Sequence, residues 1–206
     1  MNNSVFKKLL HNKGFMEGVD ILVRNKPSHK LLIKACEEFS ELTTILLKWV
    51  CKPDKIEEYD LKEEIVDAQM HIIHLISKND WDMNYFESIN ENTDYSYNYN
   101  MKKKFVVFEC ISTISRLIRL LSLKLMLRYK EIEQSNDEEI LFKIVLKNEI
   151  VKFQKSLNTL QLIFNDSKSK DKNKFEKICE QKVFKMLQSE DFNKYWKKDC
   201  KSSRIA

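Results

Sequence analysis

The sequence predicts an all-α protein, a helical bundle, and three observations support this fold class. The chain of 206 residues has two glycines and two prolines, although proteins rich in strands need many of both for their turns. Apolar residues recur at alternating spacings of four and three, the period of a helix with one buried face. Apolar side chains make up 43% of the residues, which is enough to fill a core.

Breaks in the apolar pattern divide the chain into segments. Lys26-Pro27-Ser28 ends the first helix, and Ser28 is the expected N-cap of the second. Pro53 ends the second helix, because a proline disfavours helix at the residue before it. We expect helices at residues 4–24, 29–50, 55–78, 82–92, 102–130, 137–164 and 172–188, followed by the short aromatic segment DFNKYW. The polar stretch 90–100 predicts a linker, so residues 1–98 and 99–206 would form two halves of one globular unit.

The compartment can also be predicted. The N-terminal residues lack the apolar core of an export signal. The most apolar stretch, 105–127, is interrupted by Glu109, Arg116, Arg119 and Lys124, so we expect no membrane span. The five cysteines are odd in number and form no CxxC pair, which argues against a disulfide framework or a zinc site. These features predict a cytoplasmic protein.

Charge is distributed unevenly along the chain. Residues 1–100 hold 12 Lys and Arg against 17 Asp and Glu, whereas residues 168–206 hold 12 against 6. A basic end can attract nucleic acid or phosphates. The same lysines also suit a solvated helix face, and we favour this interpretation over a nucleic-acid partner.

Two pairs of carboxylates lie at the buried faces of consecutive predicted helices. Glu38 and Glu41 are three residues apart in the helix 29–50, and Glu64 and Asp67 are three apart in the helix 55–78. A spacing of three places two side chains on adjacent turns of one helical face. Packing the two helices together would bring all four carboxylates into one small space.

Four ionised carboxylates in such a space need compensation, because burial and like charge both raise their pKa values. The sequence shows no basic residue on those two faces that would offset them. Hard divalent cations with oxygen ligands would do so, and Mg²⁺ is the commonest choice. The pattern alone is equally compatible with glutamates that face solvent, as most helical glutamates do.

Two other metal sites can be compared with the pattern. Ferritin-like di-iron bundles use Glu-x-x-His, which does not occur here, and there is no DxDxDG calcium loop. His71 and His74 extend the Glu64–Asp67 face, but we favour histidines in the core or at its rim over metal ligands.

These residues resemble the signature of a known superfamily. Glu37-Glu38-Phe39-Ser40-Glu41, followed after 22 residues by Glu64-Ile65-Val66-Asp67, is similar to the EExxE…ExxD motif of the all-α nucleoside triphosphate pyrophosphohydrolases, which include MazG-like proteins and dimeric dUTPases. The resemblance covers residues 28–95. It implies a MazG-like bundle, Mg²⁺ or Mn²⁺ held by Glu38, Glu41, Glu64 and Asp67, and a homodimer. Glu37, Glu38 and Glu41 are the implied catalytic residues, with Glu37 or Glu41 taking the proton from the attacking water.

The chain departs from the family in the residues that meet the nucleotide phosphates. MazG-like proteins often continue with E-K-x-x-x-N-x-x-R, and here Asn92 matches, whereas Ser88 and Tyr95 replace the Lys and the Arg. Basic residues must therefore come from elsewhere. Our candidates are Lys102, Lys103, Lys104, Arg116 and Arg119.

The second half aligns with the first as a degenerate repeat. Comparison of residues 102–121 with 29–48, shifted by two positions, places Glu109 on Glu38 and Ser112 on Glu41. Residues 149–160 align with 64–75, which places Glu149 on Glu64 and Lys152 on Asp67. Any two amphipathic helices can align this well, so chance similarity stays open.

The predicted activity is the Mg²⁺-dependent hydrolysis of a nucleoside triphosphate to the monophosphate and pyrophosphate. Two alternatives stay open. The missing Lys and Arg would suit a protein that binds a nucleotide without cleaving it. The basic C-terminal third would suit a helical protein that binds other proteins or nucleic acid.

Overall fold

The protein is described by a computed structural model, which places residues 4–91, 103–130, 134–164 and 174–202. These residues form helices and contain no strand, which confirms the predicted all-α class. The helices are α1 (Val5–Leu10), α2 (Lys13–Asn25), α3 (Ser28–Cys51), the 3-10 turn η1 (Pro53–Lys55), α4 (Glu58–Lys78), α5 (Met83–Glu91), α6 (Lys103–Tyr129), α7 (Asn136–Phe164), α8 (Phe175–Gln188) and α9 (Glu190–Ser202).

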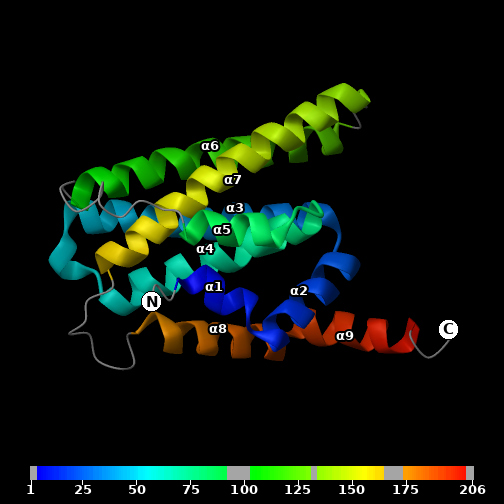
Figure 1. Ribbon diagram of the computed structural model, residues 1–206, viewed down its shortest axis with the longest axis horizontal. Helices are drawn as coiled ribbons and strands as arrows, with labels where there is room; N and C mark the ends of the chain where they lie inside the picture. Colours follow the sequence, from blue (N-terminus) through cyan, green and yellow to red (C-terminus); the bar gives the residue numbers. More distant parts are fainter. Residues whose placement is uncertain (1–3, 92–102, 131–133, 165–173, 203–206) are drawn as a thin grey trace.

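Four long helices form the centre of the fold. α3 packs against α4, α6 packs against α7, and the two pairs meet through α3 against α6 and α4 against α7. In Figure 1 α6 runs along the top, α7 descends from the upper right across α3 and α5 to the level of α4, and α8 and α9 run along the bottom beneath α1 and α2. The C-terminal helices therefore return to the first half of the chain, where α8 packs on α1, α2 and α4.

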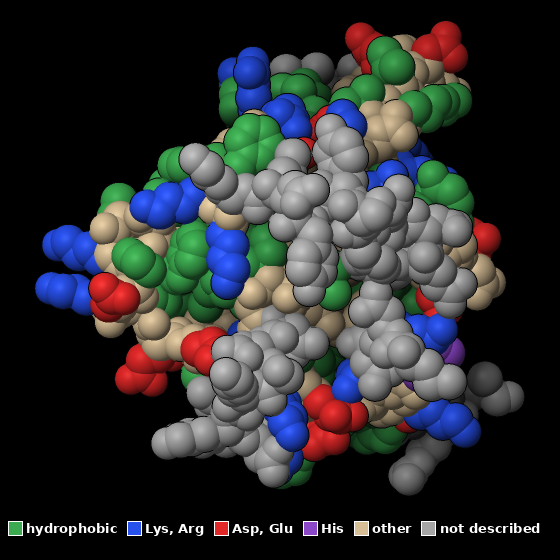
Figure 2. Space-filling view, turned by 60° about the vertical axis from the view of Figure 1, so that its left-hand side comes forward, with side chains coloured by type: hydrophobic (Ala, Val, Ile, Leu, Met, Phe, Trp, Pro, Cys, Tyr) green, Lys and Arg blue, Asp and Glu red, His purple; other side chains and the backbone are tan. Residues whose placement is uncertain are grey.

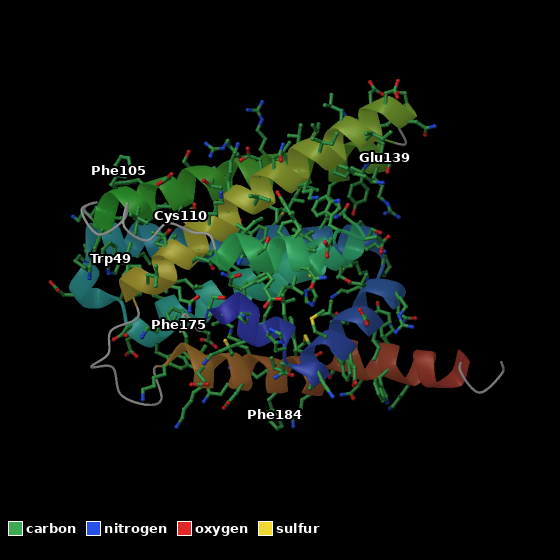
Figure 3. The ribbon with its side chains drawn as sticks, in the orientation of Figure 1. Trp49, Phe105, Cys110, Glu139, Phe175 and Phe184 are labelled. Carbon is green, nitrogen blue, oxygen red and sulfur yellow. The ribbon has the colours of Figure 1, made fainter. Side chains whose placement is uncertain are left out.

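One hydrophobic core connects both halves of the chain. It contains buried side chains from α1 to α8, so α6 and α7 share it with α3 and α4. At one end of the bundle the rings of Trp49 and Phe164 meet edge to face, 5.1 Å between centroids, which joins the ends of α3 and α7. Figure 3 shows Trp49 at this end together with Phe105 of α6.

Two predicted boundaries are wrong for local reasons. The segment 4–24 is two helices, because the side chain of Asn12 accepts a hydrogen bond from the Phe15 amide at 3.0 Å and starts α2. The second helix begins at Ser28 itself, with Pro27 in the cap position and no side-chain cap bond. The aromatic segment DFNKYW belongs to a further helix, α9. The linker predicted at 90–100 lies outside the described residues except for its first two, which end α5.

The outer surface mixes charges of both signs. Figure 2 shows basic and acidic side chains interspersed with hydrophobic ones on the described part of one side of the molecule. Among the helices that the structure describes, none has an apolar stretch long enough to cross a membrane.

Candidate metal centre

Three of the four predicted ligands come together where α3 and α4 pack side by side. Glu38 and Glu41 lie on α3, and Glu64 lies on α4. Each can offer one carboxylate oxygen, and these three oxygens lie within 4.8 Å of one another. The spacing of three residues on α3 places Glu38 and Glu41 one turn apart on the face that meets α4. The structure thus brings together three of the four carboxylates that the sequence predicts to converge.

Glu64 is the member of the cluster that α4 contributes, and it is partly buried. Its Oε2 is buried and has no hydrogen-bond partner among the described residues. Partial burial, and then the negative charges of Asp67 and Glu41, raise the pKa of Glu64 to about 7. A buried carboxylate oxygen without a partner is costly, and a cation beside it would remove that cost. The residues present therefore fit a divalent cation held by oxygen ligands.

Glu38 is buried and already has one cationic neighbour. Lys34, one turn earlier on α3, lies 2.7 Å from a Glu38 oxygen and 3.1 Å from Glu37. Burial disfavours the charged form of Lys34, but its hydrogen bonds to the two glutamates outweigh burial and raise its pKa. Glu37 itself is half-exposed.

Asp67 is paired with a lysine from the far end of the sequence. The Lys182 ammonium on α8 donates a hydrogen bond to Asp67 Oδ2 and lies 2.9 Å from Glu63. Burial raises the pKa of Asp67 to about 6, even though Lys182 acts in the opposite direction. The expectation that no basic residue offsets these acids is therefore wrong. Lys34 and Lys182 each neutralise one of them.

A cleft opens beside the acidic cluster, between α2, α3 and α4 on one side and α8 and α9 on the other. Its volume is about 590 Å³, and Glu38 and Asp67 form part of its wall. Four lysines line it, from the turn after α2 and from two helices, α3 and α8. They are Lys26, Lys34, Lys182 and Lys185. The apolar part of the wall consists of Leu22, Leu31, Met70 and Met186.

Two histidines form the inner wall of this cleft. His71 donates from Nδ1 to the Asp67 carbonyl oxygen at 3.0 Å, and the ring of His74 meets it edge to face. Burial lowers the pKa of both rings, so both are neutral at pH 7. Both nitrogens of His74 are buried, and within the part of the chain that the structure describes neither has a hydrogen-bond partner. These positions agree with histidines at the rim of the core.

The other predicted residues lie apart from the cluster or outside the description. Asn92 and Lys102 are among the residues that the structure does not describe. Arg116 lies on α6, where it donates to Glu149 of α7 at 3.0 Å and to Ser112 at 3.0 Å. The structure instead brings Lys182 and Lys185 to the cleft. In the sequence, these two lysines are distinguished only by their spacing of three residues in the basic C-terminal segment. That spacing places them on one face of a helix but does not reveal which helix this face contacts.

The α6–α7 pair also contains a buried carboxylate, at the position that the sequence alignment places on Glu64. Glu149, aligned with Glu64, is buried and bonded to Arg116 and to Lys152, the latter at 2.5 Å. Burial would raise the pKa of Glu149, but these two cations outweigh it and lower the pKa. Here two basic side chains compensate the buried carboxylate. The degenerate repeat stays a prediction that this arrangement supports.

The EExxE…ExxD residues alone carry the resemblance to the pyrophosphohydrolases. Comparison with protein-family models, with curated proteins and with solved structures found no match to this chain.

Proposed function

We propose that this protein is a nucleoside triphosphate pyrophosphohydrolase that depends on Mg²⁺ or Mn²⁺ and releases the monophosphate and pyrophosphate. The observation that carries the proposal is the cluster of Glu38, Glu41 and Glu64, whose oxygens lie within 4.8 Å of one another beside a lysine-lined cleft. The order and spacing of these residues resemble the family signature. The unpartnered buried oxygen of Glu64 supports a cation as their common ligand.

Each group has a proposed role in the reaction. Glu38, Glu41, Glu64 and Asp67 would hold the cation, which when bound supplies neutralisation of phosphate charge and a water of lowered pKa. Lys182 and Lys185 would hold the phosphates in place of the family lysine and arginine, since both line the cleft. The exposed Glu41, or Glu37, would accept the proton of the attacking water.

The cleft has room for a nucleotide. Its 590 Å³ fall within the range of ordinary small-molecule sites, about 300 to 1,000 Å³. Its apolar wall, with Met70 and Met186, would take the base, while the lysines face the charged end of the substrate. Which base or sugar is preferred is the first question for experiment.

The test is turnover of a panel of ribo- and deoxyribonucleoside triphosphates with Mg²⁺ or Mn²⁺, read as pyrophosphate release. We expect one or more nucleotides to be cleaved by the wild type. Glu64→Gln and Glu38→Gln should lose turnover while keeping the helical circular dichroism spectrum. The control, Glu180→Gln on the exposed side of α8, should keep both its turnover and its spectrum. A folded wild type that releases no pyrophosphate from any nucleotide would refute the enzyme. A nucleotide recovered uncleaved from a tight complex would favour the binding protein.

We also propose a homodimer, as the resemblance implies. The outward face of α6 supports it, because that face exposes Phe105 and Phe108 near one end and Leu123 and Met126 near the other. Light scattering after gel filtration gives the mass directly. A mass of one chain at micromolar concentration would reject the dimer.

A further inference from the structure

The position of Lys182 leads beyond the proposed reaction. Its side chain is largely buried between Asp67 and Glu63, although it lies 115 residues from Asp67 in the sequence. Burial alone would lower the pKa of Lys182, yet the charge of Asp67 and the hydrogen bonds to both carboxylates raise it. The ammonium is therefore charged where it meets Asp67.

Helix α8 is fixed in this place by contacts other than Lys182. Gln181 accepts a hydrogen bond from the Tyr59 hydroxyl at 3.0 Å, and Glu176 pairs with Lys8 at 2.7 Å. The buried side chains of Phe175, Ile178 and Val183 anchor the helix in the core. The Lys182 side chain can change partners without moving α8, because its charge ends a flexible stem with four rotatable bonds.

An ammonium group and a divalent cation compete for the same carboxylate. Asp67 belongs to the four proposed ligands, and its Oδ2 already accepts a hydrogen bond from Lys182. When Asp67 holds a cation instead, Lys182 keeps Glu63 but loses the stronger of its two carboxylate partners, so a second anion can take the place of Asp67. The cleft that Lys182 lines is where the substrate phosphates are proposed to lie.

We propose that Lys182 is an exchangeable counter-ion, which neutralises Asp67 before cation binding and a substrate phosphate after it. This inference rests on the proposed function. It gives the basic C-terminal segment a role, because α8 would supply a charge to the acidic site of the first half of the chain. It also couples the two ligands: cation binding releases the lysine for the phosphate, and phosphate binding draws the lysine away from the carboxylate. Such coupling is reciprocal.

The two affinities should respond to one substitution in opposite directions. Lys182→Met keeps the length and apolar character of the stem and removes the charge. Without its competitor, Asp67 should bind Mn²⁺ about fivefold more tightly, the size expected for a partly exposed ion pair. Pyrophosphate, measured at saturating Mg²⁺, should bind about tenfold more weakly because it loses a charged partner. A purely structural role for Lys182 would weaken both ligands together.

The experiment is calorimetric titration of Mn²⁺ alone, and then of pyrophosphate with Mg²⁺, into the full chain. Lys177→Met, on the exposed side of the same helix, is the matched control and should change neither affinity. Lys182→Gln serves as a second variant if Lys182→Met does not fold, with the same expectations. Tighter Mn²⁺ together with weaker pyrophosphate supports the exchange. Mn²⁺ affinity that is unchanged or weaker in the variant overturns it, while leaving the proposed function intact if the wild type cleaves nucleotides. A wild type that binds no Mn²⁺ overturns both.

Discussion

Phe39 of α3 and Phe153 of α7 meet edge to face in the centre of the bundle, with 5.0 Å between their ring centroids. Both side chains are fully buried. Phe39 is the direct neighbour of Glu38, so the contact that joins the two helix pairs also fixes the helix that carries the acidic cluster. Edge-to-face pairs contribute about 0.5 to 1.5 kcal/mol beyond the burial of their area.

Phe153→Ala should lower the free energy of unfolding by about 3 to 5 kcal/mol, because it leaves a cavity between α3 and α7. Urea denaturation followed by circular dichroism measures this change. The matched control is Phe184→Ala, since Phe184 is exposed and in Figure 3 its side chain points away from the bundle. Equal losses in the two variants would show that the Phe39–Phe153 contact does not hold the pairs together.

Glu64 should make the protein less stable as the pH rises. Its pKa of about 7 lies above the ordinary value of 4.5, so the folded state binds this proton more tightly than the unfolded state does. The stabilising contribution is therefore fully present below about pH 4.5 and is lost as the pH rises through 7. Asp67, with a pKa of about 6, acts in the same direction.

Glu64→Gln should therefore increase stability at pH 8, measured in urea with a chelator present. We expect about 1 kcal/mol, less than the full shift implies, because the side chain is only half-buried and solvent screens it. The gain should vanish at pH 4.5, where the wild-type carboxyl is protonated. A gain of the same size at both pH values would mean that packing, and not charge, distinguishes the variant.

Arg116 should matter for stability and not for turnover. Arg116→Met leaves the buried carboxylate of Glu149 with Lys152 alone. We expect a loss of about 2 kcal/mol, below the cost of breaking a fully buried pair because the arginine side chain is half-exposed. Adding Glu149→Gln should recover most of it. A variant that is stable but binds pyrophosphate poorly would instead place Arg116 at the substrate.

Gly18 sets the distance between α2 and α8. A Cβ atom there would lie 2.6 Å from the Met186 methyl group and 3.3 Å from Leu187. Gly18→Val should therefore lower the unfolding free energy by about 1 to 3 kcal/mol through overpacking. Gly14→Ala is the control, because a Cβ atom at Gly14 meets no atom closer than 3.5 Å. Similar thermal midpoints for wild type and Gly18→Val would show that Met186 yields without cost.

The long helices and the acidic cluster could be predicted because both depend on local spacing. Apolar stripes define α3, α4, α6 and α7, and two consecutive helices joined by a short turn pack together, which brings Glu64 to Glu38 and Glu41. The break at Asn12 was also encoded locally, in a residue type that favours helix N-caps.

The lysines of the cleft could not be predicted in the same way. Lys182 reaches Asp67 only because α8 crosses back to the first half and packs on α4, and no local pattern reveals that contact. The interpretation of residues 168–206 as a solvated basic face therefore missed the side of α8 that faces inward. Lys34 was a different omission. It is one turn before Glu38 and could have been identified as its partner from the spacing of four.

The ion pairs of Glu149 with Arg116 and Lys152 allow the acidic cluster of α3 and α4 to be compared with a neutralised carboxylate in the same molecule. The alignment places Glu149 on Glu64, and the cations that pair with Glu149 lie on α6 and α7 themselves, whereas Asp67 of α4 pairs with Lys182 of the distant helix α8. Carboxylates placed at positions 112 and 152, together with removal of the Arg116 charge, would give α6 and α7 four acidic residues at the positions that the alignment matches to Glu38, Glu41, Glu64 and Asp67. Cation binding by that variant would then show whether the acidic side chains alone are enough, or whether the lysine-lined cleft of the first half is also needed.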